Sequence, residues 1–389
     1  MVGPTIQSDI VSLILKFRLY NYVITTDIEK IYRQILVRPE DLKYQRILWR
    51  DVNNIKTFEL NTVTFGLASA PFLAIRCLQQ LAEDEGHRFP RASRVLTKDM
   101  YVDNLLSGAA TIEGALEIRN EITELLKLGS FVLRQWGSND SQILRDLDEE
   151  KIIPNCQLDA CHLDKQESVK TLGTIWNAQN DCITYIVKPV ATKLIKSKRK
   201  ILSEIGKIFD PLGLLGPIIL YAKRIMQRLW QLKLDWDESV PSSVFTAWME
   251  FCDQLPVINN VSVERKALIN DAISVQLHGF CDASECGYGE CIYLRSMDST
   301  GNISAALFYA KSRVAPLKTV SLPRLELCGA QLLAKLIKQT IAITGISFEK
   351  VVLWSDSTIT LHWIHTSPHL LKTFEANRVA DIQNQSNPS

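Results

Sequence analysis

Apolar and polar residues over 1–136 follow two periodicities, one typical of helices and one typical of strands. In chain order they predict a helix over 8–18, a strand that ends at Asp27 with a turn and a helix after it, a hairpin over 44–63, a helix over 69–86, a hairpin around Asp103, a helix that ends at Gly129 and a strand over 131–136. This order of elements predicts an α+β sheet with helices on one face.

The rest of the chain changes character twice, which predicts three domains over 1–187, 188–262 and 270–389. The elements predicted there are short strands within 137–187, tryptophan-rich helices over 188–255, strands over 275–295 and 303–314, a helix over 324–343 and a buried strand over 350–356. A strand-rich start followed by alternating helix and strand predicts a mixed sheet for the last domain.

Composition limits the class of protein without identifying it. Hydrophobic residues make up 46% of the 389 residues and charged residues 22%, so the chain can bury cores and is not expected to be disordered. The net charge is +1, so a nucleic-acid surface would have to come from local clustering of basic residues. The nine cysteines follow no paired framework, which indicates reduced thiols in an intracellular protein.

No segment is predicted to cross a membrane. The most apolar stretch, 208–222, carries Asp210 and two prolines and is too short for a bilayer. Lys16 and Arg18 interrupt the apolar run near the N-terminus, so this run does not fit a signal peptide. The chain begins in what the pattern indicates is the interior of a domain, so we expect a fragment of a longer protein.

Two acids of the first domain lie at the ends of predicted strands. Asp27 ends one strand, and Asp103 lies at a hairpin tip in YVDN, where Asn104 follows it. Carboxylates on separate elements of one sheet suit a site for two Mg²⁺ ions about 3.5–4 Å apart. Turn formation is an ordinary role for an acid at either position, and on these residues alone it is the stronger interpretation.

The last domain carries a second group of acids. Asp282 (FCDAS), Glu326 (PRLEL) and Asp356 (WSDST) are predicted at the end of a strand, the start of a helix and the end of a buried strand. Together they could meet at one edge of a sheet, where metal ions would activate water against an RNA phosphodiester. Taken singly, each acid also fits the usual chemistry of strand ends and helix caps.

Longer stretches of sequence surround both groups of acids. They include DIEKIYRQILVRPEDLKYQRILWR, which starts at Asp27, and then TVTFGLASAPFLAIRCLQQLAED and SEIGKIFDPLGLLGPIIL. In this order and spacing, the chain resembles the pol polyprotein of Bel/Pao-type long-terminal-repeat retrotransposons over essentially its whole length. The resemblance implies a reverse transcriptase followed by a ribonuclease H-like region.

The resemblance also implies a role for each matching residue. Asp27 and Asp103 would hold the polymerase metal ions, and Asp282, Glu326 and Asp356 would hold those of the ribonuclease H site. The other implied contacts are with the incoming nucleotide at Tyr32, Phe65, Gly66 and Pro71 and with the primer at Leu172 and Gly173. Tyr32 could instead be a core aromatic on an amphipathic helix.

Three departures from the family bear on activity. Asn104 stands where the family has Asp, so a charge beside the two metal ions is lost, and metal affinity and rate should fall. We expect the fingers, which the family carries upstream of its first acid, to be largely missing. We also expect the end of the ribonuclease H domain, which carries the family's fourth acid, to be missing. Asp381 is not assigned as that fourth acid. Impaired activity is therefore expected at both sites.

A basic cluster opens the helical segment that resembles a polymerase thumb. It predicts phosphate contacts with a nucleic-acid duplex, although a solvated helix face is nearly as well supported. Its residues are Lys188, Lys193, Lys196, Lys198, Arg199 and Lys200. Cys156, Cys161 and His162 lack a second pair of ligands at zinc spacing, so we predict no zinc site there.

The predicted fold is α+β and multi-domain. A polymerase palm-like sheet with helices and connection strands occupies 1–187, a helical thumb-like segment 188–262, and an incomplete, mixed α/β ribonuclease H-like domain 270–389. The resemblance implies an RNA-directed DNA polymerase fragment that uses Mg²⁺ or Mn²⁺ and acts on an RNA template, an RNA–DNA hybrid and dNTPs. Its location would be the cytoplasm, in a virus-like particle, or the nucleus, with other pol products as partners.

Two alternatives stay open. The chain could be a catalytically inactive remnant that binds RNA–DNA duplex or a partner protein, which Asn104 and the missing segments favour. It could also be an interrupted reading frame without a stable product.

Overall fold

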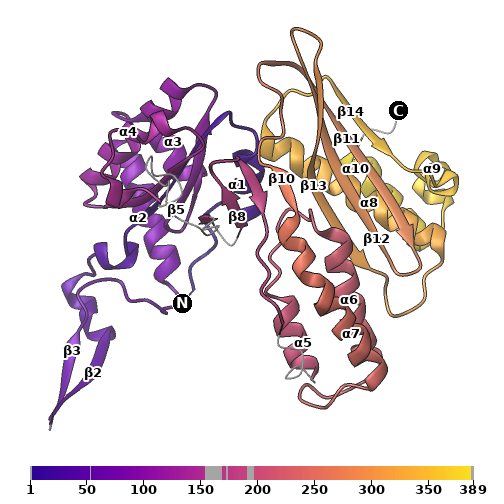
Figure 1. Cartoon of the computed structure of the whole chain (residues 1–389), viewed down its shortest axis with the longest axis horizontal. Coiled ribbons are helices and arrows are strands. Elements are labelled where there is room, and N and C mark those ends of the chain that lie inside the picture. Colours follow the sequence, from indigo (N-terminus) through magenta and orange to yellow (C-terminus); the bar gives the residue numbers. More distant parts are fainter. Residues whose placement is uncertain (1, 53, 154–168, 172–173, 191–196, 387–389) are drawn as a thin grey trace. The chain divides into compact units, whose positions relative to one another are not determined.

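The computed structural model of the chain describes residues 2–52, 54–153, 169–171, 174–190 and 197–386 (Figure 1). Its contacts divide it into two compact units, Met1–Leu172 with Asn177–Asp181 and Gly173–Trp176 with Cys182–Ser389. Several residues discussed above lie outside the described ranges: Leu172, Gly173, Lys193, Lys196, Cys156, Cys161 and His162.

The first unit is built on a four-stranded sheet with the strand order β4-β5-β1-β6. Its strands are β1 (Tyr22–Ile28), β4 (Met100–Tyr101), β5 (Asn104–Ala109) and β6 (Leu133–Ser138). β1 is a central strand that pairs antiparallel with both β5 and β6. The consecutive residues Val23, Ile24, Thr25 and Thr26 are all buried, which means that both faces of the sheet are covered.

Helices cover this sheet, and most of them match the predicted spans. They are α1 (Ile10–Phe17), α2 (Ala70–Glu85), α3 (Pro90–Lys98) and α4 (Ile112–Leu128). α4 packs on β1 and β5 and shares one core with α2 and α3, in which Ile24, Leu78 and Ile122 are buried. The side chains of Asp9 and Thr111 cap the first turns of α1 and α4, so local capping agrees with the apolar pattern.

The helix predicted after Asp27 is only a four-residue 3₁₀ turn, η1 (Ile31–Gln34). Lys30 before it has a left-handed φ of 46°, and Ile35 after it is already extended. A second 3₁₀ turn, η2 (Pro39–Tyr44), leads to the predicted hairpin. This hairpin, β2 (Arg46–Asp51) and β3 (Asn54–Glu59), is a separate two-stranded sheet, and every residue of β3 is exposed.

The second unit contains a four-stranded sheet with the strand order β13-β12-β11-β14. Strands β11 (Ala272–Ser284), β12 (Gly287–Asp298) and β13 (Ile303–Val314) pair antiparallel in sequence order, and β14 (Lys350–Trp354) pairs parallel with β11. The prediction of a buried strand at β14 is wrong, because β14 is an edge strand without a buried residue. Within the described ranges no strand pairs with its outer side.

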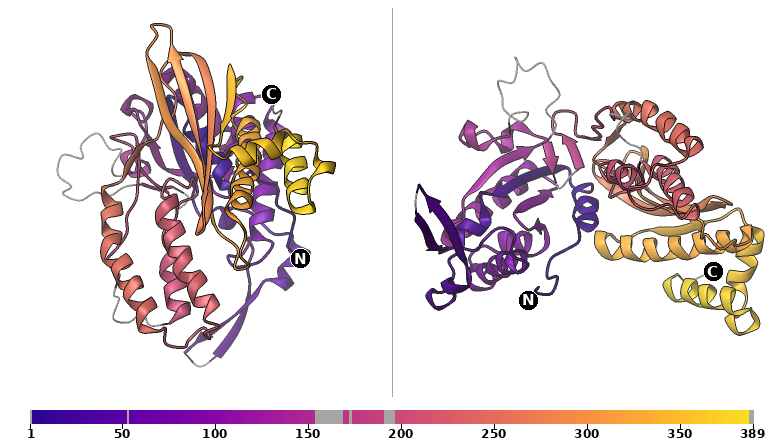
Figure 2. Two further views of the ribbon diagram at one scale, coloured as in Figure 1. Left: turned by 90° about the vertical axis from the view of Figure 1, so that its right-hand side faces the viewer. Right: turned by 90° about the horizontal axis from the view of Figure 1, so that it is seen from below.

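Helix α8 (Leu322–Thr344) lies along β11 and β12, and α10 (Thr373–Gln385) packs beside α8 (Figure 2). Gly279 on β11 permits this approach, since a Cβ atom there would lie 2.6 Å from Leu333 of α8. The other elements are η3 (Ser141–Ile143), η4 (Glu149–Lys151), β7 (Val169–Thr171), β8 (Thr174–Asn177), β9 (Cys182–Thr184), α5 (Lys198–Ile205), α6 (Gly216–Gln231), α7 (Ser242–Gln254), η7 (Leu255–Asn260), β10 (Ser262–Glu264), α9 (Thr358–His365) and η8 (Pro368–Leu370).

The helices α6 and α7 pack against each other, and α6 also contacts β13. Throughout the described ranges, no helix combines the length and the apolar character that a membrane span requires. No disulfide forms among the described cysteines.

Candidate functional site

The strand register brings the two acids of the first unit to one place. Asp27 lies near the end of β1, directly opposite Asn104 at the start of β5. Asp103 precedes Asn104 at the hairpin tip, and its carbonyl oxygen accepts a hydrogen bond of 2.9 Å from the N–H of Ile28. The two acids are therefore neighbours at one end of the central strand pair.

The hairpin tip is held in an unfavourable backbone conformation. Val102 has a left-handed φ of 57°, which is uncommon for any residue with a side chain and a true outlier for a β-branched one. Its N–H donates a hydrogen bond of 3.0 Å to Oε1 of Gln7. Strain of this kind persists only where surrounding contacts hold it, and it is common at functional sites.

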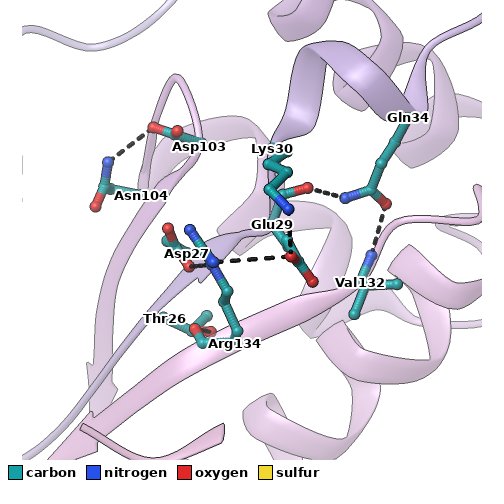
Figure 3. Close-up of polar contacts among 9 residues, drawn as sticks. All are labelled: Thr26, Asp27, Glu29, Lys30, Gln34, Asp103, Asn104, Val132 and Arg134. Atoms are coloured by element: carbon teal, nitrogen blue, oxygen red, sulfur yellow. Dashed lines mark hydrogen bonds and ion pairs between the residues drawn. The ribbon is translucent and has the colours of Figure 1, made fainter.

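Neighbouring side chains already form polar contacts with both acids (Figure 3). Nε–H of Arg134, on β6, donates to Oδ1 of Asp27 at 3.1 Å, and its guanidinium lies 3.8 Å from the carboxylate of Glu29. The side-chain amide of Asn104 donates to Oδ1 of Asp103 at 2.8 Å. Burial raises the pKa of both Asp27 and Asp103, and the Arg134 charge opposes the rise at Asp27.

The residues assigned to the nucleotide gather next to these acids. Tyr32 and Phe65 meet edge to face with ring centroids 4.9 Å apart. Burial, and then the charge of Asp103, raises the pKa of the Tyr32 phenol, so the phenol lies within electrostatic range of that carboxylate. Phe65 is 54% exposed, Gly66 beside it has a left-handed φ of 86°, and Pro71 lies in the first turn of α2. Tyr32 is half-buried against the core rather than on an amphipathic helix.

The sequence analysis missed two polar residues of this region. Arg134 pairs with Asp27, and Gln34 links two segments by accepting a hydrogen bond from the N–H of Val132 and donating one to the carbonyl of Glu29 (Figure 3). A signal for Arg134 was available, because a cation inside the apolar strand predicted over 131–136 needs a partner. Nothing in the sequence named Asp27 as that partner.

The three acids of the second unit converge closely. Asp282 lies on β11, Glu326 near the start of α8 and Asp356 two residues beyond the end of β14. Each offers one carboxylate oxygen, and these oxygens lie within 4.8 Å of one another. Asp282 and Asp356 are exposed, whereas Glu326 is only 8% exposed.

The electrostatics of this cluster favour a bound cation. Burial raises the pKa of Glu326, and the charges of Asp282 and Asp356 raise it further. Oε2 of Glu326 is buried and has no hydrogen-bond partner among the described residues. Carboxylate oxygens are the ligands that Mg²⁺ prefers, and an ion would both satisfy this oxygen and relieve the repulsion. The three residues therefore fit a divalent metal ion.

The described basic residues of the thumb-like segment differ in their surroundings. Lys198 is buried, and its Nζ lies 3.3 Å from the ring centroid of Trp230. Arg199 is exposed and forms two hydrogen bonds of 2.8 and 2.9 Å with the carboxylate of Asp237. Lys200 is also exposed. Lys198 thus packs inside the unit, while Arg199 and Lys200 lie on its surface.

Comparison with known families finds a match over the segment that contains the second site. Residues 197–357 match the family model described as a Pao retrotransposon-like RNaseH-like domain. This segment contains Asp282, Glu326 and Asp356, but neither Asp27 nor Asp103. Among curated proteins no match is found.

Solved structures of foamy viral protease-reverse transcriptase share the fold of the chain. The dRH form in complex with double-stranded DNA is 13% identical, with a TM-score of 0.57, and the alignment covers 99% of this chain and 58% of that one. The complex with RNA/DNA hybrid is 13% identical with a TM-score of 0.54, and the alignment covers 100% of this chain and 45% of that one. A further complex with double-stranded DNA is 15% identical with a TM-score of 0.53, and the alignment covers 100% of this chain and 70% of that one. The chain thus spans about half the length of the first two proteins, and the likeness establishes the fold alone.

Proposed function

Because residues 197–357 match the model of the Pao retrotransposon-like RNaseH-like domain, we propose that the chain is a retroelement pol fragment. In this proposal the second unit cleaves the RNA strand of an RNA–DNA hybrid with divalent metal ions. The convergence of Asp282, Glu326 and Asp356 carries this proposal, because three carboxylate oxygens within 4.8 Å suit a metal-dependent phosphodiester hydrolysis. Mg²⁺ is the expected ion, and Mn²⁺ should substitute for it.

In this proposal the three acids hold the metal, which when bound lowers the pKa of a water molecule and stabilises charge on the phosphate. Asp282 and Asp356 are exposed and lie on the side that a nucleic-acid backbone can reach. Glu326 is buried beneath them and must lose its proton before it can bind the ion, which its raised pKa delays to higher pH.

The experiment is cleavage of a hybrid with a labelled RNA strand by the full chain. We expect cleavage with Mg²⁺ or Mn²⁺, none with EDTA, and none of the same RNA as a single strand. Failure to cleave the hybrid with either ion, by a chain that circular dichroism shows to be folded, would contradict the proposal.

For the first unit we propose a reverse transcriptase palm with Asp27 and Asp103 as its metal-binding acids and an RNA template, a primer and dNTPs as its substrates. The register that makes Asp27 and Asp103 neighbours, with Tyr32 and Phe65 beside them, supports this assignment. The proposal also keeps the domain boundaries at 187 and 262–270. It keeps the predicted contacts of the other site residues with the primer and with phosphates.

A second candidate for this unit is duplex binding without polymerisation. The observation in its favour is that Arg134 already pairs with Asp27, where a metal ion would supply the positive charge. Asn104, at the position where the family resemblance implies an acid, donates a hydrogen bond to Asp103. Primer extension on an RNA template, by this chain and by Asn104→Asp, separates the two. Extension by N104D alone would mean a polymerase site disabled at one ligand, and duplex binding without extension by either chain would favour the second candidate.

A further inference from the structure

One face of the second unit's sheet carries a row of aromatic rings. Leu277 and Gly279 on β11 are buried on the side of α8, so the alternate residues His278 and Phe280 lie on the opposite face. The rings of Phe280 and Trp354 are nearly parallel, at 9°, with centroids 6.1 Å apart. His278 continues the row at 6.3 Å from Trp354, whose Nε1–H donates to its Nδ1 at 3.2 Å. Phe280 and Trp354 are 41% and 49% exposed, which is unusual for large aromatic side chains in a pair.

Charged groups lie at both ends of this row. In the sheet register, Gln276 lies opposite both Arg295 on β12 and Lys350 on β14, so these two cations share the face of the rings. They are close enough to His278 to lower its pKa, after the larger effect of burial. At the other end of the row, Asp282 follows two residues after Phe280 and belongs to the acidic cluster.

The rings also border an open pocket. A hollow of 550 Å³ lies between the start of α6 and the sheet, and its lining includes Phe280, Tyr293, Asp282, Gly213 and Pro217. Its volume is within the range of small-molecule and cofactor sites. Tyr293 meets Phe280 edge to face at 5.9 Å, so the pocket wall continues the aromatic row. The accessible surface thus runs from two cations, past four rings, to Asp282 of the acidic cluster.

We propose that this aromatic face is a binding site for single-stranded nucleic acid, with bases stacked on Phe280 and Trp354 and phosphates near Arg295 and Lys350. Each base has a π-face that stacks on aromatic side chains, and cations track the phosphates. A protein partner fits less well, because burying Arg295, Lys350 and Gln276 in an apolar interface would cost their hydration. The proposal goes beyond hybrid cleavage, since this binding needs neither metal nor hydrolysis.

The test measures binding in EDTA by fluorescence anisotropy of a labelled 12-nucleotide oligothymidine with the full chain. Phe280→Ala and Trp354→Ala should each weaken binding by about tenfold, as expected for loss of one stacking platform. Arg295→Gln and Lys350→Gln should weaken it less and should reduce the dependence of affinity on salt concentration. Ile303→Ala is the matched control, because Ile303 is 55% exposed on β13 of the same sheet.

Thermal unfolding of each variant confirms that the fold is retained, and the Glu326→Gln variant separates this proposal from the previous one. Glu326 lies on α8, outside the lining of the pocket, so E326Q should bind the oligonucleotide as the original chain does while losing hybrid cleavage. Folded F280A and W354A variants that bind as tightly as the original chain would overturn the aromatic site even if cleavage is intact. A chain that forms dimers, which F280A dissociates, would also overturn it, because the face would then be a protein interface.

Discussion

The two acidic sites of this chain differ in what balances their negative charge. In the first unit, Asp27 pairs with Arg134 and Asp103 accepts from Asn104, so the protein itself satisfies both carboxylates. In the second unit, three carboxylate oxygens lie within 4.8 Å of one another, and burial, followed by the charges of Asp282 and Asp356, raises the pKa of Glu326. Burial also raises the pKa of Asp27 and Asp103, but there the Arg134 cation opposes the rise, so the second cluster is the better suited to a bound cation.

At the first site, the backbone geometry and the side-chain charges support different conclusions about metal binding. The first unit keeps the strand pairing that makes Asp27 and Asp103 neighbours, and even the strained φ of Val102 at the hairpin tip. Beside these acids lie the cation of Arg134 and the neutral amide of Asn104. We therefore expect the proposed palm to bind metal ions weakly, although its backbone makes the two acids neighbours.

The largest effect is expected from removing one acid of the second site. Asp282→Asn leaves a neutral ligand and should reduce hybrid cleavage by about 10²–10³-fold, the usual loss when one preorganised electrostatic contact is removed. Steady-state cleavage of a labelled hybrid in Mg²⁺ measures it. Asp298→Asn is the control, because Asp298 is a turn acid whose carboxylate accepts hydrogen bonds from Thr300 and Asn302. Equal activity of D282N and the original chain would contradict a metal role for this cluster.

The second unit also holds a buried acid for which the described residues provide no hydrogen-bond donor. Glu290 on β12 is 5% exposed, and both of its carboxylate oxygens lack a partner among the described residues. Burial raises its pKa to about 8, against the opposing charges of Lys311 and Arg313. Between the ordinary pKa of a glutamate and pH 8, the folded chain therefore holds a proton that the unfolded chain has lost. Stability should fall as pH rises through this window.

Glu290→Gln removes this titration without changing the size of the side chain. It should stabilise the chain at pH 8 by on the order of 3 kcal/mol and have little effect at pH 5, where Glu290 is protonated in the folded state. Urea unfolding at the two pH values measures the difference, with the exposed Glu250→Gln as the control. The same gain at both pH values would mean that the buried charge is not its cause.

The difference between the two sites shows which features a sequence predicts well. Asp27 and Asp103 could be predicted as neighbours because a hairpin and a strand end are local patterns. The helix capped by Thr111 was predictable for the same reason, since the cap and the apolar period agree. The convergence of Asp282, Glu326 and Asp356 followed from placing each acid at the end of an element on one sheet.

Features that depend on the order of strands could not be predicted in this way. Arg134 reaches Asp27 only because β6 lies beside β1, a neighbour relation that no local pattern contains. The same holds for Trp354, which stacks on Phe280 through the parallel pairing of β14 with β11. Lys198 was predicted as a surface cation from the charge run, but tertiary packing places its ammonium over Trp230.

Two separate substitutions at the first site should each make its charge more like that of the second site. Asn104→Asp adds a carboxylate, and Arg134→Gln removes the cation that competes for Asp27. Each should raise Mn²⁺ affinity at this site by about tenfold, or about 1.4 kcal/mol. Electron paramagnetic resonance of free Mn²⁺ measures it in a chain that also carries Asp282→Asn and Glu326→Gln, so that only the first site binds. Unchanged affinity in both variants would mean that charge balance does not limit this site.

The smallest expected effect is the pH dependence of metal binding at the second site. Burial and two neighbouring acids raise the pKa of Glu326 above that of an isolated carboxyl, which is about 4.3. Protons should therefore compete with the metal ion for the second site at pH values where an isolated carboxyl has already ionised. Mn²⁺ affinity at this site should therefore still rise several-fold between pH 5 and pH 7. In Glu326→Gln the affinity should be lower and its rise with pH smaller. If the pH dependence is the same with and without Glu326, the proton that competes with the metal resides on another group.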